Sequence, residues 1–204
     1  MATIPVLVKK DHIEALVATK TPIVSVAELF WNGLDADADI VSIRFEHNGL
    51  GGLERIRVQD NGSGFNHEDA NELFGNLGGS WKSEKRRTAK GRSLHGKSGK
   101  GRFRAFALGS LVEWRTRSKR GEKFVSFTVK GSLANLEAFE LGEPQEMESS
   151  STGTEVVISN PSSTVRKRHM LVMRHLRETE RVLALHFRRL RSTKRLPWKL
   201  ASTS

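Results

Sequence analysis

The chain has 204 residues, of which 37% are apolar and 28% charged, with a formal net charge of +11 and no cysteine. This length and apolar content predict one domain with a substantial core, and the lack of cysteine excludes disulfides and thiolate metal sites. The stretch from Met1 to His12 lacks the apolar region of a signal peptide, and no apolar run approaches about 18 residues. We therefore expect a cytoplasmic protein without a membrane partner.

The positive charge is concentrated in two segments. Residues 82–104 carry 10 basic and 1 acidic side chains, and residues 165–204 carry 12 basic and 2 acidic ones. The second segment has a helical pattern from 163 to about 191, with an apolar stripe on one face and arginines on the other. Such a face is commonly only solvated, but residues 165–199 are also a candidate surface for nucleic acid or an acidic partner.

The first informative motif along the chain is a helix pattern. Ser25 followed by Glu28 matches a capping box, and the apolar residues that follow predict a helix reaching about Ala38. Glu28, Asn32 and Asp35 share one stripe of this helix because they are spaced i, i+4 and i+7. The other faces are nearly all apolar, so we expect a buried helix whose carboxylate and amide need a partner such as a hydrated metal phosphate. The alternative is a solvated stripe on which Glu28 only caps the helix.

A second motif follows a predicted hairpin. Residues 40–47 and 53–59 alternate between apolar and polar, and a glycine-rich turn separates them. Asp60 then lies at a strand end, a usual place for a functional side chain. Gly62 and Gly64 permit backbone conformations and a close ligand approach that a Cβ would block. A plain turn is the alternative, since Asp-Asn-Gly is strong turn chemistry.

A third motif is glycine-rich and has two interpretations. Residues 91–98 satisfy the P-loop pattern GxxxxGK followed by Ser, but the residues before them are polar and basic where a P-loop needs a buried strand. Gly99 and Gly101 also interrupt the helix that should follow. The resemblance of these three motifs to the ATP-binding domain of the GHKL superfamily implies instead that the glycines of residues 91–101 form a mobile phosphate-covering lid. This lid would lead into a helix over 102–108 whose first amides face the phosphates. Both interpretations predict a nucleoside triphosphate.

These three motifs, followed by Gly153 and Thr154 before the apolar run 155–159, resemble the ATP-binding domain of the GHKL superfamily. That superfamily includes gyrase B, the ninety-kilodalton heat-shock chaperones, histidine kinases and mismatch-repair MutL. The resemblance covers residues 24–160 and implies the Bergerat fold. This is an α+β two-layer sandwich in which helices cover one face of a mixed, mostly antiparallel sheet. Further strands are expected at 111–117, 123–130, 136–142 and 154–159, with a loop over 142–153.

The resemblance also implies roles for individual residues. Asn32 would supply an oxygen to Mg²⁺, and Glu28 would activate the attacking water. Asp60 would accept a hydrogen bond from the adenine amino group, and Thr154 would bond that aspartate and a water. The other residues expected at the nucleotide are Asp35, Gly62, Gly64, Ser80, Lys82, Gly96, Lys97, Ser98, Gly99, Lys100, Gly101, Arg102 and Phe103. Of these, Ser80 and Lys82 come from a segment that loosely resembles the lid of MutL-like members.

We therefore expect an ATP-binding domain over residues 1–162 and a basic helical segment over residues 163–204. The expected function is Mg²⁺-dependent ATP binding with slow hydrolysis, in which ATP switches the conformation or the homodimer state. MutL-like and chaperone-like members continue into a transducer domain whose Lys reaches the terminal phosphate. This chain ends about where such a domain would start, so the resemblance predicts binding more directly than hydrolysis. The alternatives are a histidine-kinase-like phosphotransfer domain, although no phosphoacceptor helix pair is apparent, and a nucleic-acid-binding module regulated by nucleotide.

Overall fold

A single sheet dominates the computed structural model, which describes residues 2–5, 22–75, 88–91, 101–148, 150–167 and 199–200. Its strands are β1 (Ala2–Pro5), β2 (Val41–His47), β3 (Leu53–Asp60), β4 (Gly109–Arg120), β5 (Lys123–Ser132), β6 (Asn135–Leu141), β7 (Gln145–Met147), β8 (Gly153–Pro161) and β9 (Lys199–Leu200). They lie in the order β1-β6-β5-β4-β8-β3-β2-β9, and β7 pairs with β5. Within the described ranges, all pairings are antiparallel except that of β2 with β9.

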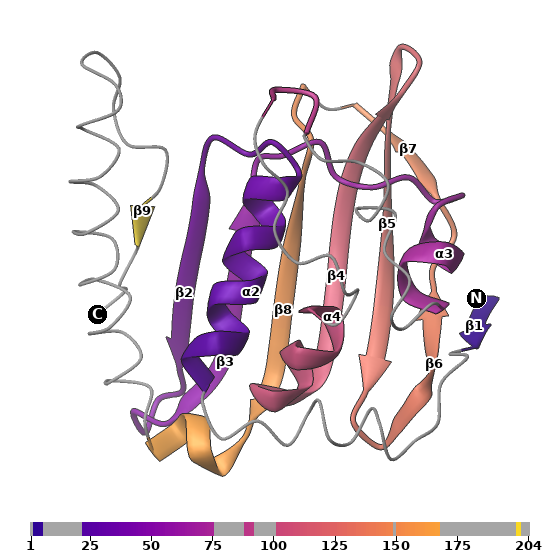
Figure 1. Cartoon of the computed structure of the whole chain (residues 1–204). Coiled ribbons are helices and arrows are strands. Elements are labelled where there is room, and N and C mark those ends of the chain that lie inside the picture. The colour runs from indigo at the N-terminus through magenta and orange to yellow at the C-terminus, as the bar shows by residue number, and fades with distance from the viewer. Residues whose placement is uncertain are drawn as a thin grey trace, which may run out of the picture.

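The described helices lie on one face of this sheet (Figure 1). They are α2 (Pro22–Asp35), α3 (Ala70–Gly75), α4 (Gly101–Arg104) and the 3₁₀ turn η2 (Ala105–Ala107). This arrangement confirms the predicted α+β architecture, in which helices cover one face of a mostly antiparallel sheet. None of the helices in the described part of the chain is both long and apolar enough to cross a membrane.

The core lies between α2, α4 and the covered face of the sheet. The apolar side chains of the covered face alternate along the strands, as expected for a sheet buried on one side. They include Ile56, Val58, Val112, Trp114, Val129, Phe139, Val156 and Ile158, all at most 7% exposed. Val26 and Leu29 of α2 pack against them at helical spacing. This packing fixes α2 over the part of the sheet that contains β3, the strand that ends at Asp60.

The other face of the sheet carries charged side chains that pair across neighbouring strands. Arg57 Nη1 lies 3.1 Å from Glu155 Oε1, and Arg115 Nη1 lies 3.2 Å from Glu155 Oε2. Arg115 Nη2 also lies 2.9 Å from Glu113 Oε2. An open hollow of about 750 Å³ lies mainly on this face and is lined by Glu113, Glu155 and Arg115 as well as by polar residues of β5. The face is therefore a solvated surface of paired charges, because antiparallel sheets can leave one side to water.

Several predicted element boundaries were wrong. Residues 142–153 were expected to form a loop, but they contain the short strand β7, whose polar residues show no apolar alternation. The helix expected over 102–108 is only the four-residue α4 followed by η2. The P-loop pattern after Gly91 lies outside the described residues, and the mostly antiparallel sheet differs from the parallel strand–helix–strand unit in which that motif occurs.

Candidate functional site

Asp60 is the last residue of β3 and has its carboxylate held on one side by backbone amides. Its Oδ1 accepts hydrogen bonds from the N–H groups of Gly62, at 2.8 Å, and of Thr154, at 3.2 Å. Among the described residues, none donates a hydrogen bond to Oδ2, and no cation pairs with the carboxylate. Burial raises the pKa of Asp60 from 3.8 to about 6, although the two amide hydrogen bonds oppose this shift. Asp60 is therefore an oriented acceptor whose Oδ2 has no hydrogen-bond donor in the described part of the chain.

Glycines pack closely around this carboxylate. A Cβ on Gly33 of α2 would lie 2.8 Å from Val41 Cγ2 and 3.0 Å from Asp60 Cβ. A Cβ on Gly62 would lie 2.6 Å from the carbonyl oxygen of Ala36. Neither position has room for a side chain, so α2 and the loop after β3 approach Asp60 more closely than other residues would allow. This cradle places the carboxylate beside the helix that carries the first sequence motif.

Two threonines connect Asp60 to the loop that follows it. Thr116 of β4 and Thr154 of β8 are cross-strand partners whose Oγ1 atoms lie 3.5 Å apart. The buried Thr116 hydroxyl also accepts a hydrogen bond from the N–H of Phe65 at 3.1 Å. Gly64 has a φ of +67°, and a Cβ there would lie 2.3 Å from the carbonyl oxygen of Arg117. The conformation of this loop therefore requires glycine at 64 and is fixed by β4.

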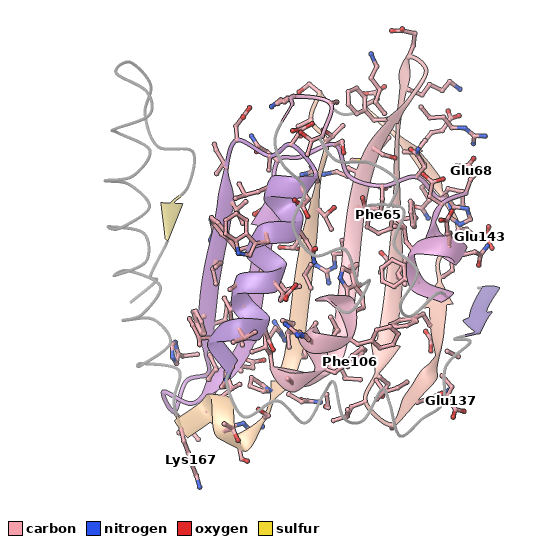
Figure 2. All side chains as sticks on the ribbon, in the orientation of Figure 1. Phe65, Glu68, Phe106, Glu137, Glu143 and Lys167 are labelled. Carbon is pink, nitrogen blue, oxygen red and sulfur yellow. The ribbon has the colours of Figure 1, made fainter. Side chains whose placement is uncertain are left out.

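The aromatic ring after this loop belongs to the core. Phe65 packs at 5.7 Å from Phe74 and at 5.3 Å from Phe127, measured between ring centroids. Figure 2 shows Phe65 on the helix-covered side of the sheet, between β4 and α3. These contacts of Phe65 with other core rings anchor the end of the loop that follows Asp60.

The helix α2 differs from its predicted form at both ends. It begins at Pro22, a residue well suited to the first turn, so Ser25 lies inside the helix and does not cap it. Its Oγ is buried and, within the described residues, has no hydrogen-bond partner. The helix ends at Asp35 and is not buried all round, since Asn32 is exposed and Val24 is 40% exposed. Glu28 is therefore not part of a capping box.

The three polar residues of α2 have different environments. Asp35 is 5% exposed, Glu28 is partly buried and Asn32 is exposed. Glu28 Oε1 lies 2.6 Å from Nη1 of Arg104, the last residue of α4, and each of these two side chains is 29% exposed. Helix α2 therefore makes two connections. It packs against Asp60 through Gly33, and its Glu28 pairs with Arg104 in the segment that follows the glycine-rich motif.

The turn after α2 holds residues 88–91. The carboxylate of Asp37 accepts hydrogen bonds from the Thr88 hydroxyl and from the Lys90 N–H, the latter at 3.0 Å. Lys90 Nζ donates to the Asp37 carbonyl oxygen and pairs with Asp39, both at 2.9 Å. The neighbouring carbonyl oxygen of Ala36 accepts the N–H of Ser63 at 2.8 Å. One turn therefore fixes both the loop after Asp60 and the residues that precede the glycine-rich motif.

Part of the predicted site lies outside the described residues. These positions are Ser80, Lys82, Gly96, Lys97, Ser98, Gly99 and Lys100. Gly101 and Arg102 belong to α4, and Phe103 in the same helix has no exposed surface and packs in the core. The structure brings Gly62 and Thr154 to Asp60 at the end of β3, with Gly64 in the following loop. Glu28 and Asn32 lie within α2, and Asp35 is its last residue. The roles of these residues toward a nucleotide remain predictions.

Sequence reasoning missed Gly33, Thr116 and Arg104. A signal for Gly33 was available, because a glycine inside a helix costs about 1 kcal/mol and commonly has a packing reason. Thr116 occupies an inward-facing position of a strand, where a hydroxyl needs a partner, but the partners are far away in sequence. No local pattern connects Arg104 to Glu28, since they are 76 residues apart.

Comparison with known proteins identifies the family. The model of the histidine kinase-, DNA gyrase B-, and HSP90-like ATPases matches residues 20–154, which is most of the chain. The chain therefore belongs to this family of ATPase domains, and this membership supports ATP binding. A putative type II restriction enzyme, HgiDII of Herpetosiphon aurantiacus, is 28% identical over 144 residues, covering 68% of this chain and 22% of that protein. The chain thus spans less than a quarter of that relative's length.

The raised pKa of Asp60 predicts that Asp60→Asn stabilises the protein in the absence of nucleotide. Between pH 3.8 and about 6 the folded protein binds more protons at this group than the unfolded chain does, so stability falls as pH rises through this window. At neutral pH the ionised carboxylate therefore costs up to about 3 kcal/mol, at about 1.4 kcal/mol per pKa unit. Asparagine keeps an oxygen acceptor for the two amides and has no charge to bury.

Urea unfolding of the parent and of Asp60→Asn at pH 7 and pH 4 measures this effect. The variant should be more stable at pH 7, and most of its advantage should disappear at pH 4. An equal stability difference at the two pH values would show that Asp60 ionisation does not destabilise the fold.

Proposed function

We propose that this domain binds Mg²⁺-ATP and hydrolyses it slowly, and that ATP acts as a switch of conformation or of homodimer state. The observation that carries the proposal is the Asp60 carboxylate: Oδ1 accepts hydrogen bonds from the Gly62 and Thr154 amides, and Oδ2 has no donor among the residues that the structure describes. Gly33 and Gly62 let α2 and the loop after β3 pack closely around this carboxylate, which holds it in place. Membership of the ATPase family supports the same ligand.

Asp60 would select adenine over guanine. The exocyclic amino group of adenine can donate a hydrogen bond to Oδ2, whereas guanine presents a carbonyl oxygen at the equivalent ring position. A carbonyl facing a carboxylate brings two acceptors together and leaves both unsatisfied, which is a strong basis for discrimination. Because Oδ1 is already fixed by two amides, the carboxylate cannot rotate away from the mismatched base without losing those hydrogen bonds.

Hydrolysis would use the two polar residues of α2 in different ways. The oxygen of a water bonds to the γ-phosphorus, the water proton passes to Glu28, and the bond to the β–γ bridging oxygen breaks, leaving ADP with the electron pair. Asn32 would hold Mg²⁺ through its side-chain oxygen, and the ion would neutralise phosphate charge. In the described part of the chain, no cluster of three or more His, Asp or Glu could hold a metal alone. This fits an ion bound mainly through substrate phosphates.

Asn32→Ala tests the metal-dependent part of this proposal. In the parent, ATP affinity should be higher with Mg²⁺ than with a chelator, because Asn32 would hold the ion and the ion would neutralise phosphate charge. In Asn32→Ala the two affinities should move toward the same value, while metal-free binding stays near the parental level. Isothermal titration with and without Mg²⁺ measures both quantities.

Asn66→Ala is a matched control, because this exposed asparagine hydrogen-bonds Asp69 on the loop before α3 and lies outside the proposed site. It should keep the parental dependence on Mg²⁺. If Asn32→Ala also keeps that dependence in full, Asn32 is not a ligand of the ion.

A second candidate function is nucleic-acid binding regulated by nucleotide. It is supported by the basic residues of 165–199 and by the relative that is named as a restriction enzyme. Electrostatic contacts to phosphates release counterions, so such binding weakens steeply as salt is raised. Filter binding of DNA over a series of salt concentrations, with and without ATP, distinguishes this function. A salt-dependent affinity that changes with ATP supports it, and no binding at low salt excludes it.

A further inference from the structure

Glu28, the proposed general base, is joined to Arg104 by a short ion pair. Arg104 Nη1 lies 2.6 Å from Glu28 Oε1, and both side chains are largely withdrawn from solvent at 29% exposure. Partial burial strengthens such a charge-assisted hydrogen bond and limits its screening by salt. Within the described residues, Glu28 forms an ion pair only with Arg104. This pair connects α2 with α4 across 76 positions of sequence.

The backbone that carries Arg104 is firmly held. Phe103 and Ala105, its two neighbours, are both 0% exposed, and Phe106 is 2% exposed. Phe103 packs against Phe139 at 5.8 Å between ring centroids. Phe106 of η2, labelled in Figure 2, packs against the same Phe139 ring at 6.2 Å. A guanidinium held on such a backbone has few alternative positions, so it can fix the orientation of the carboxylate that it contacts.

The ion pair engages only one of the two oxygens of the Glu28 carboxylate among the described residues. Arg104 engages Oε1 of Glu28, and no described residue donates a hydrogen bond to Oε2. A general base must present one oxygen to the water proton in a fixed direction, and small misplacements reduce the rate strongly. We propose that Arg104 is a positioning residue that orients Glu28 so that Oε2 accepts the proton of the attacking water. This inference rests on the proposed ATPase function and adds a residue to it.

Steady-state and single-turnover hydrolysis of Arg104→Ala and Arg104→Lys test this role. Arg104→Ala should lower kcat about tenfold or more with little change in KM or in ATP affinity, because orientation of the base affects the chemical step. Arg104→Lys should recover part of the rate, since an ammonium supplies the charge without the planar fork. A change confined to KM would instead place Arg104 at the phosphates and overturn the inference.

A double-mutant cycle separates positioning from general stabilisation. Once Glu28→Gln has removed the base, Arg104→Ala should cause no further loss of rate, because there is no carboxylate to orient. The matched control is Arg115→Ala, which breaks ion pairs with Glu113 and Glu155 on the open face of the sheet and should keep the parental kcat.

The outcomes are distinguishable from a failure of the proposed function. A parent that binds ATP but releases no phosphate overturns the ATPase proposal and this inference with it. A parent that hydrolyses ATP while Arg104→Ala keeps the parental kcat overturns the inference alone. Equal losses from Arg104→Ala in the parent and in Glu28→Gln would also overturn it, since the effect would then be independent of the base. Urea unfolding of each variant shows whether the fold is retained.

Discussion

Replacement of Glu28 by alanine should leave ATP binding nearly unchanged and lower the rate of hydrolysis by a factor of about 10² or more. The carboxylate is the acidic group of α2 that is partly open to solvent and held in one orientation by Arg104. Its removal deletes the proton acceptor but no predicted contact to the nucleotide. Single-turnover release of inorganic phosphate from radiolabelled ATP, with equilibrium binding on the same preparations, measures the two effects separately.

Glu113→Ala is the control for this experiment, because it also removes a glutamate paired with an arginine, but on the open face of the sheet. It should hydrolyse ATP at the parental rate. If Glu28→Ala does the same, Glu28 is only the ion-pair partner of Arg104. If label appears on the protein instead of in free phosphate, the domain is a histidine-kinase-like phosphotransferase and the water-activating role is wrong.

Asp60→Asn should weaken ATP binding by about one to two orders of magnitude. The amide that replaces the carboxylate presents either a donor toward the adenine amino group or a weaker acceptor. A mismatched buried hydrogen bond costs about 1–3 kcal/mol, and each 1.4 kcal/mol is about tenfold in affinity. The same substitution should stabilise the protein without nucleotide, so weaker binding cannot be attributed to a less stable fold. Retention of the parental affinity by this variant would remove Asp60 from the site.

Local sequence patterns predicted the parts of the fold whose periodicity is strong. The hairpin of β2 and β3 was expected over 40–47 and 53–59 and is found at Val41–His47 and Leu53–Asp60. The turn between these strands could be predicted because asparagine side chains commonly bond the backbone of a turn. In the structure, Asn48 accepts hydrogen bonds from the N–H groups of Leu50 and Gly52. Strands β4, β5, β6 and β8 were likewise found near their expected positions, since their apolar residues alternate.

Features that depend on tertiary contacts could not be predicted in this way. The strand β7 is polar and is stabilised by pairing with β5, and α3 has only six residues. The start of α2 was placed at Ser25 because a capping box is a local signal, whereas the helix actually begins at Pro22. Of the site, the sequence indicated Glu28 and Asp60, but the residues that position them come from distant strands and helices. Thr116 and Arg104 are therefore findings of the structure.

Titration of the parent and of Asp60→Asn with Mg²⁺-ATP and Mg²⁺-GTP, followed by calorimetry at neutral pH, tests most directly whether the Asp60 carboxylate is an adenine-binding acceptor. The parent should bind ATP with clearly higher affinity than GTP, because only adenine donates a hydrogen bond to Oδ2. In Asp60→Asn this preference should be reduced, since the amide can also donate to the guanine carbonyl. Equal affinity of the parent for ATP and GTP would contradict the assignment of Asp60 and, with it, the proposed adenine site.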